Sequence, residues 1–181
     1  MTEITIENIV AHAQIADDVL IEDIAQKIEG VSYDPEKFKG LTYKMEQPKT
    51  AILLLPSGKA ICTGAKKIED VEKALDEFID KLESINANVK KEIDIEIHNM
   101  VVSTDINKEL HLSSISKGLL LEKVDYEPSN FPGLIYRMDD FGAIILIFSS
   151  GKIVCTGTKD FEEASKAIEI MKEKLTSIGA F

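Results

Sequence analysis

The chain of 181 residues contains two copies of one sequence pattern, and this internal repeat limits the possible folds more than any other feature. The segment Tyr33–Met45 reappears at Tyr126–Met138, and Ser57–Lys66 reappears at Ser150–Lys159. Both pairs keep the same offset of 93 residues. A repeat that holds its spacing in this way predicts a duplicated fold.

The repeat also sets the expected domain boundary. Upstream of the two long blocks, Ile6–Val10 matches Ile97–Val101 at an offset of 91, so the second copy carries two extra residues before Tyr126. We therefore expect one structural repeat at residues 1–90 and a second at 91–181.

Each half predicts a strand, a short helix, several strands and a long helix. The opening segment alternates in the manner of a strand, with Ile4, Ile6, Asn8 and Val10 on one face. Gln47–Lys49 and Pro56–Gly58 are typical of turns between strands. In the first half we expect a helix at 18–29, begun by Asp17 or Asp18 and ended at Gly30, strands at 31–33, 41–45, 50–55 and 59–63, and a helix at 68–85.

The long helices are predicted from apolar residues at helical spacing. The stripe of the first is Ile68, Val71, Leu75, Phe78, Ile79 and Leu82, and that of the second is Phe161, Ala164, Ile168, Met171, Leu175 and Ile178. These elements favour an α+β fold in which two pseudo-symmetric repeats form one curved, antiparallel, ten-stranded sheet with helices on a single face.

Two of the expected strands do not alternate as a sheet covered on one face should. Ala51–Leu55 and Ala143–Phe148 are apolar at consecutive positions. Either both faces of these strands are buried, or the uncovered face is apolar because it binds a partner. Composition favours neither explanation.

The formal net charge of −11 is unusual for a protein that binds nucleic acid, but the charges are segregated. Residues 37–66 carry six lysines and one acid, residues 130–159 have a small positive excess, and the expected helices hold most of the acids. Locally basic strands could meet phosphates while acidic helices face solvent. A solvated amphipathic surface would produce the same pattern.

No catalytic, metal-binding or membrane motif is recognisable. The longest apolar run is of strand length, and the N-terminus has no basic, apolar leader, so we expect a cytoplasmic protein. Cys62 and Cys155 are expected to be buried strand residues, and the three histidines, His12, His98 and His111, have no metal-ligand spacing. We expect no cofactor, no metal and no enzymatic activity.

Three doubled motifs together resemble the core of the TATA-box-binding protein family. They are Phe-x-Gly-Leu-x-Tyr-[Lys/Arg]-Met, Ser-Gly-Lys-x-[Ile/Val]-Cys-Thr-Gly and Ile-x-Asn-[Ile/Met]-Val, in order and at matching spacing over nearly the whole chain. The acidic sequence pI of about 4.8 resembles that of archaeal members. The family is itself a known example of minor-groove binding with bending.

The resemblance implies a saddle-shaped initiation factor that bends promoter DNA, recruits transcription factor B and RNA polymerase, and works in the cytoplasm with the nucleoid. It places the groove-floor amides at Asn8 and Asn99, where short amides can donate to the acceptors of A·T pairs. Phe38, Phe131 and Phe148 match three apolar wedges, whereas Leu55, followed by Pro56, stands where the fourth phenylalanine is expected.

The remaining site residues follow from the same resemblance. The small groove-facing contacts are Val10, Leu53, Ile61, Thr63, Val101, Leu146, Val154 and Thr156. The phosphate-contacting bases are Lys37, Lys44, Lys49, Lys59, Arg137 and Lys152, with Asn130 and Gly142 in place of two further cations of the second copy. Glu127 matches a contact with transcription factor B, and Ser129 replaces a residue that is usually acidic.

Other readings remain open at this point. The free protein could form a homodimer through its apolar face. A two-repeat α/β protein could use a curved sheet as a ligand-binding or catalytic pocket. A related saddle domain could also belong to a nuclease or glycosylase, which requires a second, catalytic domain.

Overall fold

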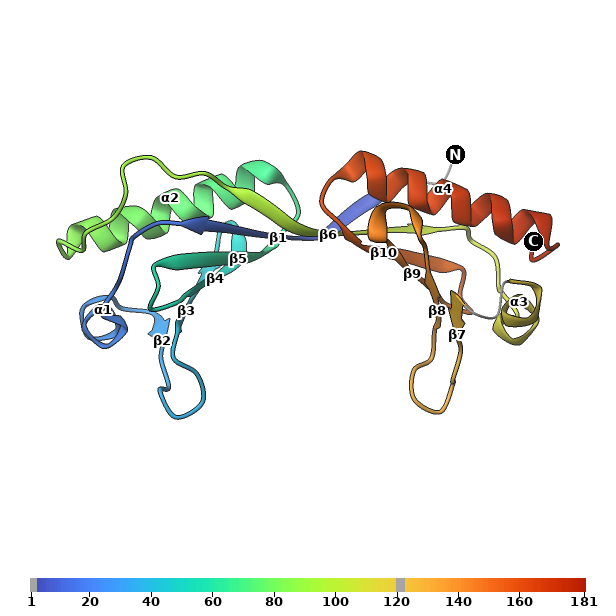
Figure 1. Cartoon of the computed structure of the whole chain (residues 1–181), viewed down its shortest axis with the longest axis horizontal. Helices are drawn as coiled ribbons and strands as arrows, with labels where there is room; N and C mark the ends of the chain where they lie inside the picture. The colour runs from blue at the N-terminus through green and yellow to red at the C-terminus, as the bar shows by residue number, and fades with distance from the viewer. Residues whose placement is uncertain (1–2, 120–122) are drawn as a thin grey trace. The chain divides into compact units, whose positions relative to one another are not determined.

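The computed structural model describes residues 3–119 and 123–181. It divides into two compact units, Asn8–His98 and Met1–Glu7 with Asn99–Phe181 (Figure 1). The first residues of the opening strand therefore belong with the second repeat, and residues 96–98 belong with the first. The prediction of an α+β fold built from two repeats is confirmed.

The unit Asn8–His98 contains the first repeat. Its strands follow the order β2-β3-β4-β5-β1, and each pair is antiparallel. The elements are β1 (Thr5–Gln14), α1 (Ile21–Lys27), β2 (Val31–Ser32), β3 (Leu41–Glu46), β4 (Lys49–Leu54), β5 (Lys59–Ala65) and α2 (Ile68–Ser84).

The second repeat has the same arrangement, with antiparallel strands in the order β6-β10-β9-β8-β7. Its elements are β6 (Glu96–Asp105), α3 (Leu112–Gly118), β7 (Val124–Asp125), β8 (Leu134–Arg137), β9 (Ile144–Ile147), β10 (Lys152–Thr158) and α4 (Phe161–Ser177). A short 3₁₀ turn, Asp140–Gly142, joins β8 to β9.

In each unit the long helix covers one face of the sheet, as Figure 1 shows for α2 and α4. Ile52, Leu54 and Cys62 on the strands and Leu75 and Phe78 on α2 are fully buried, so the core of the first unit lies between α2 and the sheet. Only one long helix packs on each sheet, and the prediction that helices cover a single face is confirmed.

The short helices differ from the sequence prediction at their beginnings. Helix α1 begins at Ile21 instead of residue 18, and its N-cap is Leu20, which makes no side-chain capping bond. The expectation that Asp17 or Asp18 caps this helix is wrong because the Val19 N–H instead donates to Pro56 O at 3.0 Å and holds the preceding segment in an extended path. The helix also ends before Gly30, at Lys27.

Two residues of the predicted apolar stripes are exposed to solvent. Ile68 is 48% exposed and Phe161 is 43% exposed, and each is the first residue of its long helix. Helical spacing alone therefore overestimates burial in the first turn of each long helix. Ala74 and Ala167 are fully buried instead, because small residues allow the helices to approach the strands.

No helix among residues 3–119 and 123–181 combines the length and apolarity needed to cross a bilayer.

Candidate nucleic-acid interface

The face of each sheet away from its long helix is apolar but not buried. In β4, the buried residues Ile52 and Leu54 alternate with the half-buried Ala51 and Leu53, and in β9 Ile145 and Ile147 alternate with Ile144 and Leu146. Of the two explanations for these non-alternating strands, burial on both faces is therefore excluded. We call this side of each sheet its open face.

Strand register aligns the predicted contact residues in rows across the open face. In the first unit Leu53 pairs with Ile61 and with Thr42, and in the second unit Leu146 pairs with Val154 and Ile135. A further row in each unit carries a base, an aliphatic residue and a threonine: Lys44, Ala51 and Thr63, or Arg137, Ile144 and Thr156. The first kind of row is mostly aliphatic, and the second adds one cationic and one hydroxyl side chain.

The two predicted amides occupy equivalent and fixed positions. Gly64 N donates to Asn8 Oδ1 at 2.7 Å, and Gly157 N donates to Asn99 Oδ1 at 2.8 Å. Each amide nitrogen Nδ2 then donates to a threonine hydroxyl, Thr63 Oγ1 at 3.2 Å or Thr156 Oγ1 at 3.0 Å. Because Oδ1 accepts a backbone N–H, Nδ2 is the atom that remains to donate.

The amide groups therefore act as oriented donors. Asn8 and Asn99 are half-buried, and one hydrogen of each NH₂ has no acceptor within residues 3–119 and 123–181. A ligand that offers acceptors and no donors at this position is complementary to the arrangement.

The predicted wedges lie in pairs over a glycine. A Cβ added at Gly40 would lie 2.7 Å from Phe38 Cε1 and 3.3 Å from Leu55 Cδ2. At Gly133 the corresponding distances are 2.8 Å to Phe131 Cε1 and 3.1 Å to Phe148 Cε1. Only glycine leaves room for both side chains, so Gly40 and Gly133 allow the two members of each wedge pair to lie close together.

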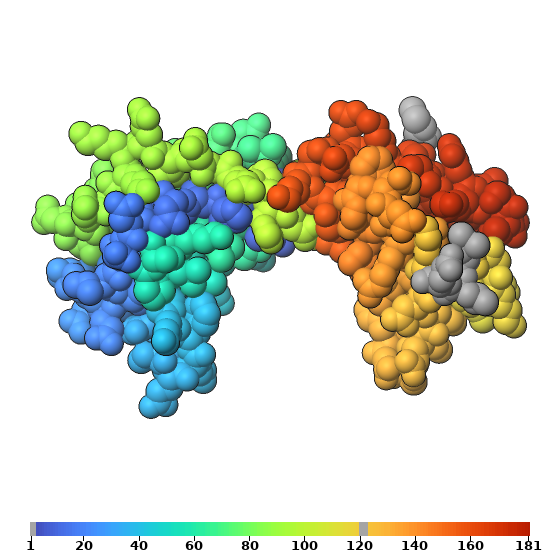
Figure 2. Space-filling model, in the orientation of Figure 1, coloured from blue at the N-terminus to red at the C-terminus, as the bar shows by residue number. Residues whose placement is uncertain are grey.

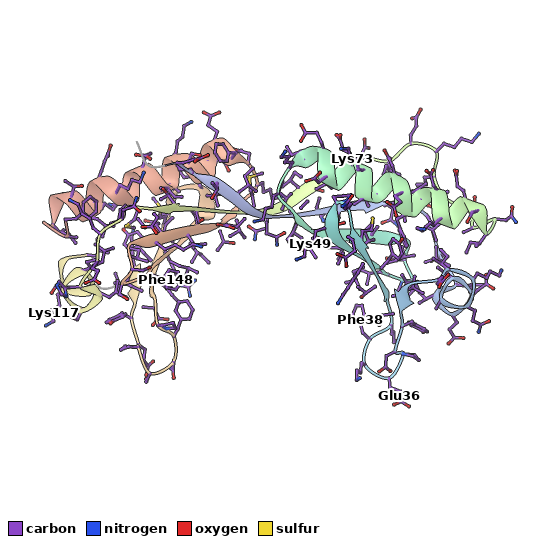
Figure 3. All side chains as sticks on the ribbon, turned by 180° about the vertical axis from the view of Figure 1, so that it is seen from behind. Glu36, Phe38, Lys49, Lys73, Lys117 and Phe148 are labelled. Atoms are coloured by element: carbon purple, nitrogen blue, oxygen red, sulfur yellow. The ribbon has the colours of Figure 1, made fainter. Side chains whose placement is uncertain are left out.

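The two wedge pairs differ in shape. The rings of Phe131 and Phe148 meet edge to face, with centroids 5.9 Å apart, which is a favourable geometry for aromatic pairs. In the first unit the single ring of Phe38 is 48% exposed and packs beside the aliphatic Leu55. Figure 3 shows Phe38 on the side of its sheet away from α2, and shows Phe148 in the equivalent region of the second unit.

The predicted cations lie at the margins of the open faces. Lys44, Lys49 and Arg137 are exposed, and none has an ion-pair partner in the part of the chain that the structure describes. Lys37 pairs with Asp34 at 3.1 Å, and Lys152 lies 3.8 Å from Glu7. Lys49 lies away from α2, whose Lys73 projects from the helix-covered side (Figure 3).

Glu127, the predicted contact for transcription factor B, is exposed in the turn before Phe131, and its carbonyl accepts from Asn130 N and Phe131 N. Ser129 is exposed in the same turn. The surface is thus accessible without rearrangement of the strands.

Sequence reasoning missed several residues of this surface. Gly64 and Gly157 orient the amides, Gly40 and Gly133 seat the wedges, and Thr42, Ala51, Ile135 and Ile144 complete the rows. The signal was present, since each glycine recurs at the same place in both copies. It was not interpreted because a hydrogen-bonding or steric role depends on a neighbouring strand.

His12 is a further residue of the open face that the sequence did not single out. It pairs with Ile61, its Nε2 lies 3.1 Å from Glu96 Oε2, and its ring centroid lies 5.5 Å from that of His98. The corresponding residue of the second copy, at the offset of 91, is Ser103, whose hydroxyl donates to Glu7 at 2.5 Å. The two open faces therefore carry different polar groups at this position.

The cysteines are buried residues of the covered face, as predicted. Cys62 and Cys155 are both free and fully buried. Burial raises the pKa of each thiol from its ordinary value of 9.0 to about 11. No group of three or more His, Cys, Asp or Glu side chains among the described residues could hold a metal ion.

Taken together, these features define a protein of two α+β repeats. In each repeat a long helix covers one face of the antiparallel sheet, and the other face carries apolar rows and an oriented amide. The family model for transcription factor TFIID, or TATA-binding protein, matches residues 3–85 and 94–178. The chain belongs to this family.

Archaeal relatives match almost end to end. The chain is 44% identical to the TATA-box-binding protein of Picrophilus torridus, covering 99% of this chain and 97% of the relative. It is 45% identical to that of Thermoplasma volcanium, covering 98% and 96%. The solved structure of Methanococcus jannaschii TBP is similar with a TM-score of 0.87 and 39% identity, over 97% of this chain and 99% of that one.

Proposed function

We propose that this protein is a transcription initiation factor that binds the minor groove of TATA-box promoter DNA through its two open faces. The observation that carries the proposal is the pair of oriented amides at Asn8 and Asn99. The minor-groove edge of an A·T pair offers only the acceptors A N3 and T O2, whereas a G·C pair adds the N2 amino donor. An amide fixed to donate is satisfied by A·T and opposed by G·C.

The apolar rows fit the same ligand. A minor groove widened against a sheet presents sugars and base edges, and the aliphatic residues beside Leu53 and Leu146 offer contact without requiring hydrogen bonds. The flanking cations Lys44, Lys49 and Arg137 are placed to meet phosphates, which supplies affinity without sequence preference.

The wedge pairs support a bent complex. Apolar side chains inserted between base steps unstack them and kink the duplex away from the protein. Phe131 with Phe148, and Phe38 with Leu55, are the exposed or half-exposed candidates for that insertion. The aromatic pair should kink its end of the site more strongly than the mixed pair.

We further propose that the DNA-bound protein recruits transcription factor B through the exposed turn that contains Glu127, and RNA polymerase through the resulting complex. The role is one of binding, not catalysis. In the absence of DNA, the apolar open faces would favour a homodimer. DNA would dissociate this dimer because it binds the same faces.

The test is a fluorescence titration of labelled duplexes with an A·T-rich TATA sequence and a G·C-rich control of equal length. We expect clear preference for the TATA duplex, an affinity that falls steeply with salt, and tighter binding when transcription factor B is added. Equal affinity for the two duplexes at every salt concentration would overturn the proposal.

A further inference from the structure

The first repeat has an apolar groove beside α1 that the DNA-facing surface does not use. It has a volume of about 670 Å³ and is lined by α1, by residues of the 33–39 loop and by Pro56. A second hollow of about 370 Å³ continues it, sharing Glu22, Gln26, Tyr33 and Pro35. Figure 2 shows α1 and the 33–40 loop as adjacent surfaces of this unit.

An exposed leucine stands at the edge of the groove. Leu20 lines it and is 79% exposed, more than any other large hydrophobic residue among those described. Its neighbours Val19 and Ile21 have structural roles, since the Val19 N–H bonds to Pro56 O and Ile21 is buried. The Leu20 carbonyl accepts from Ile24 N, but its side chain makes no capping bond.

The second repeat shows that the fold does not require this surface. The same backbone hydrogen bond recurs there, from Leu110 N to Ser149 O at 2.8 Å. At the equivalent positions, however, His111 replaces Leu20 and Ser149 replaces Pro56. The apolar character of the groove is therefore particular to the first copy and can be removed by residues that the same fold already accepts.

The charge around the two equivalent helices also differs. Residues 17–29 carry five acids and one lysine, whereas the matching residues 108–120 carry one acid and two lysines. Within the groove itself, Asp23 is held by Lys27 at 2.8 Å, and Lys39 is a cation of the lining. Glu22 has no ion-pair partner among the described residues, so it can meet a cation from outside.

We propose that this groove docks a basic amphipathic segment of a protein partner. An apolar side chain of the segment would pack between Leu20 and Pro56, and flanking lysine or arginine residues would meet Glu22 and the acidic segment before α1. Helices with an apolar face and charged margins bind grooves in this way. None of the residues that line the groove is a proposed DNA contact, and Glu127 belongs to the other unit.

The probe is a fluorescein-labelled synthetic peptide that forms a helix with leucines on one face and lysines on the other. We expect it to bind the intact protein, and Leu20→His with Glu22→Ser to weaken binding by about tenfold, because a leucine contact and a charge contact are lost. Both substitutions copy the second repeat. Amide chemical-shift changes should map to α1 and the 33–39 loop.

The matched control is Ile68→His with Glu69→Ser on α2, which also removes one exposed apolar residue and one exposed acid. This variant should bind the peptide as the parent does. Equal weakening by the two variants, equal binding of a peptide with glutamates in place of the lysines, or shift changes confined to other faces would each overturn the proposal. A change of sedimentation coefficient with the groove variant alone would assign the groove to a second copy instead.

Discussion

At the scale of single residues, the orientation of one amide carries the proposed selectivity for A·T base edges. Asn99 is oriented by the Gly157 N–H, which occupies Oδ1 and leaves Nδ2 as the donor. A freely rotating asparagine could present oxygen or nitrogen and would discriminate less. The selectivity proposed for the open face thus depends on a backbone hydrogen bond as much as on the side chain.

Replacing Asn99 with alanine should therefore relax selectivity more than it weakens binding. We expect the ratio of affinities for the A·T-rich and G·C-rich duplexes to fall by about tenfold, since one hydrogen bond and one clash are removed. Titration of both duplexes checks this. Asn88→Ala, in the exposed segment between the repeats, is the control, and an unchanged ratio for Asn99→Ala would remove the amide from the recognition surface.

Lys49→Ala should behave in the opposite way. Its exposed ammonium is proposed to meet a phosphate, so its loss should weaken binding to every sequence and reduce the slope of log K against log salt by about 1. Titrations at several salt concentrations measure that slope. Lys73→Ala on α2 is the control, because that lysine lies on the helix-covered side. A change of sequence preference would contradict the assignment.

Leu55→Phe should restore an aromatic pair in the first unit. The new ring would lie beside Phe38 over Gly40, as Phe148 lies beside Phe131 over Gly133. A larger wedge should unstack its base step more fully and increase the bend. Energy transfer between dyes at the two duplex ends reports the bend angle, and no change would exclude Leu55 as a wedge.

At the scale of elements, the two copies use different solutions for the same helix terminus. Asp160 caps α4 by accepting from Glu163 N at 2.8 Å, whereas its counterpart Lys67 gives α2 no side-chain cap. The backbone at the two positions is nearly the same, with φ of −138° and −140°. The capped and the uncapped helix therefore differ in the side chain at the N-cap position, not in its backbone φ.

Lys67→Asp should consequently stabilise the protein by about 0.5–1 kcal/mol, and Asp160→Ala should destabilise it by about 1 kcal/mol. Urea denaturation gives both values. Lys67→Ala separates loss of the lysine from gain of the cap. If Lys67→Asp is no more stable than Lys67→Ala, the cap has not formed.

At the scale of the whole molecule, each core contains one thiol with a raised pKa. Burial holds the pKa of Cys62 and Cys155 at about 11 in the folded state. In the unfolded chain a thiol titrates near its ordinary value of 9.0. Below that pH both states are protonated and the thiols do not affect stability. Above it only the unfolded state ionises, so stability falls until the folded thiols ionise as well.

The free energy of unfolding should therefore decrease between about pH 9 and 11, by about 2–3 kcal/mol for each thiol. Denaturation at a series of pH values measures the decrease. The double variant Cys62→Ala and Cys155→Ala should lack this part of the pH dependence, although lysines also titrate in that range. If the free energy of unfolding falls with pH by the same amount in parent and variant, the thiols do not contribute to the decrease.

Much of this architecture follows from the sequence. Tyr33–Met45 and its copy establish the duplication, alternation in the opening strand and the stripe from Val71 to Leu82 predict the elements, and the doubled motifs identify the family. These features are local or periodic, so a single chain displays them. The helix beginning at Ile21 and the exposed Ile68 were mispredicted, because both depend on contacts with a distant strand or on where the sheet ends.

The amino-acid sequence by itself determined two copies of an α+β unit, a surplus of apolar strand residues and a separation of acidic helices from basic strands. Only the tertiary structure decided that one face of each sheet stays open, that glycine N–H groups orient the amides, and that an apolar groove lies beside α1. Spacing along a chain specifies which residues share a face, whereas what covers that face depends on elements that meet it from elsewhere.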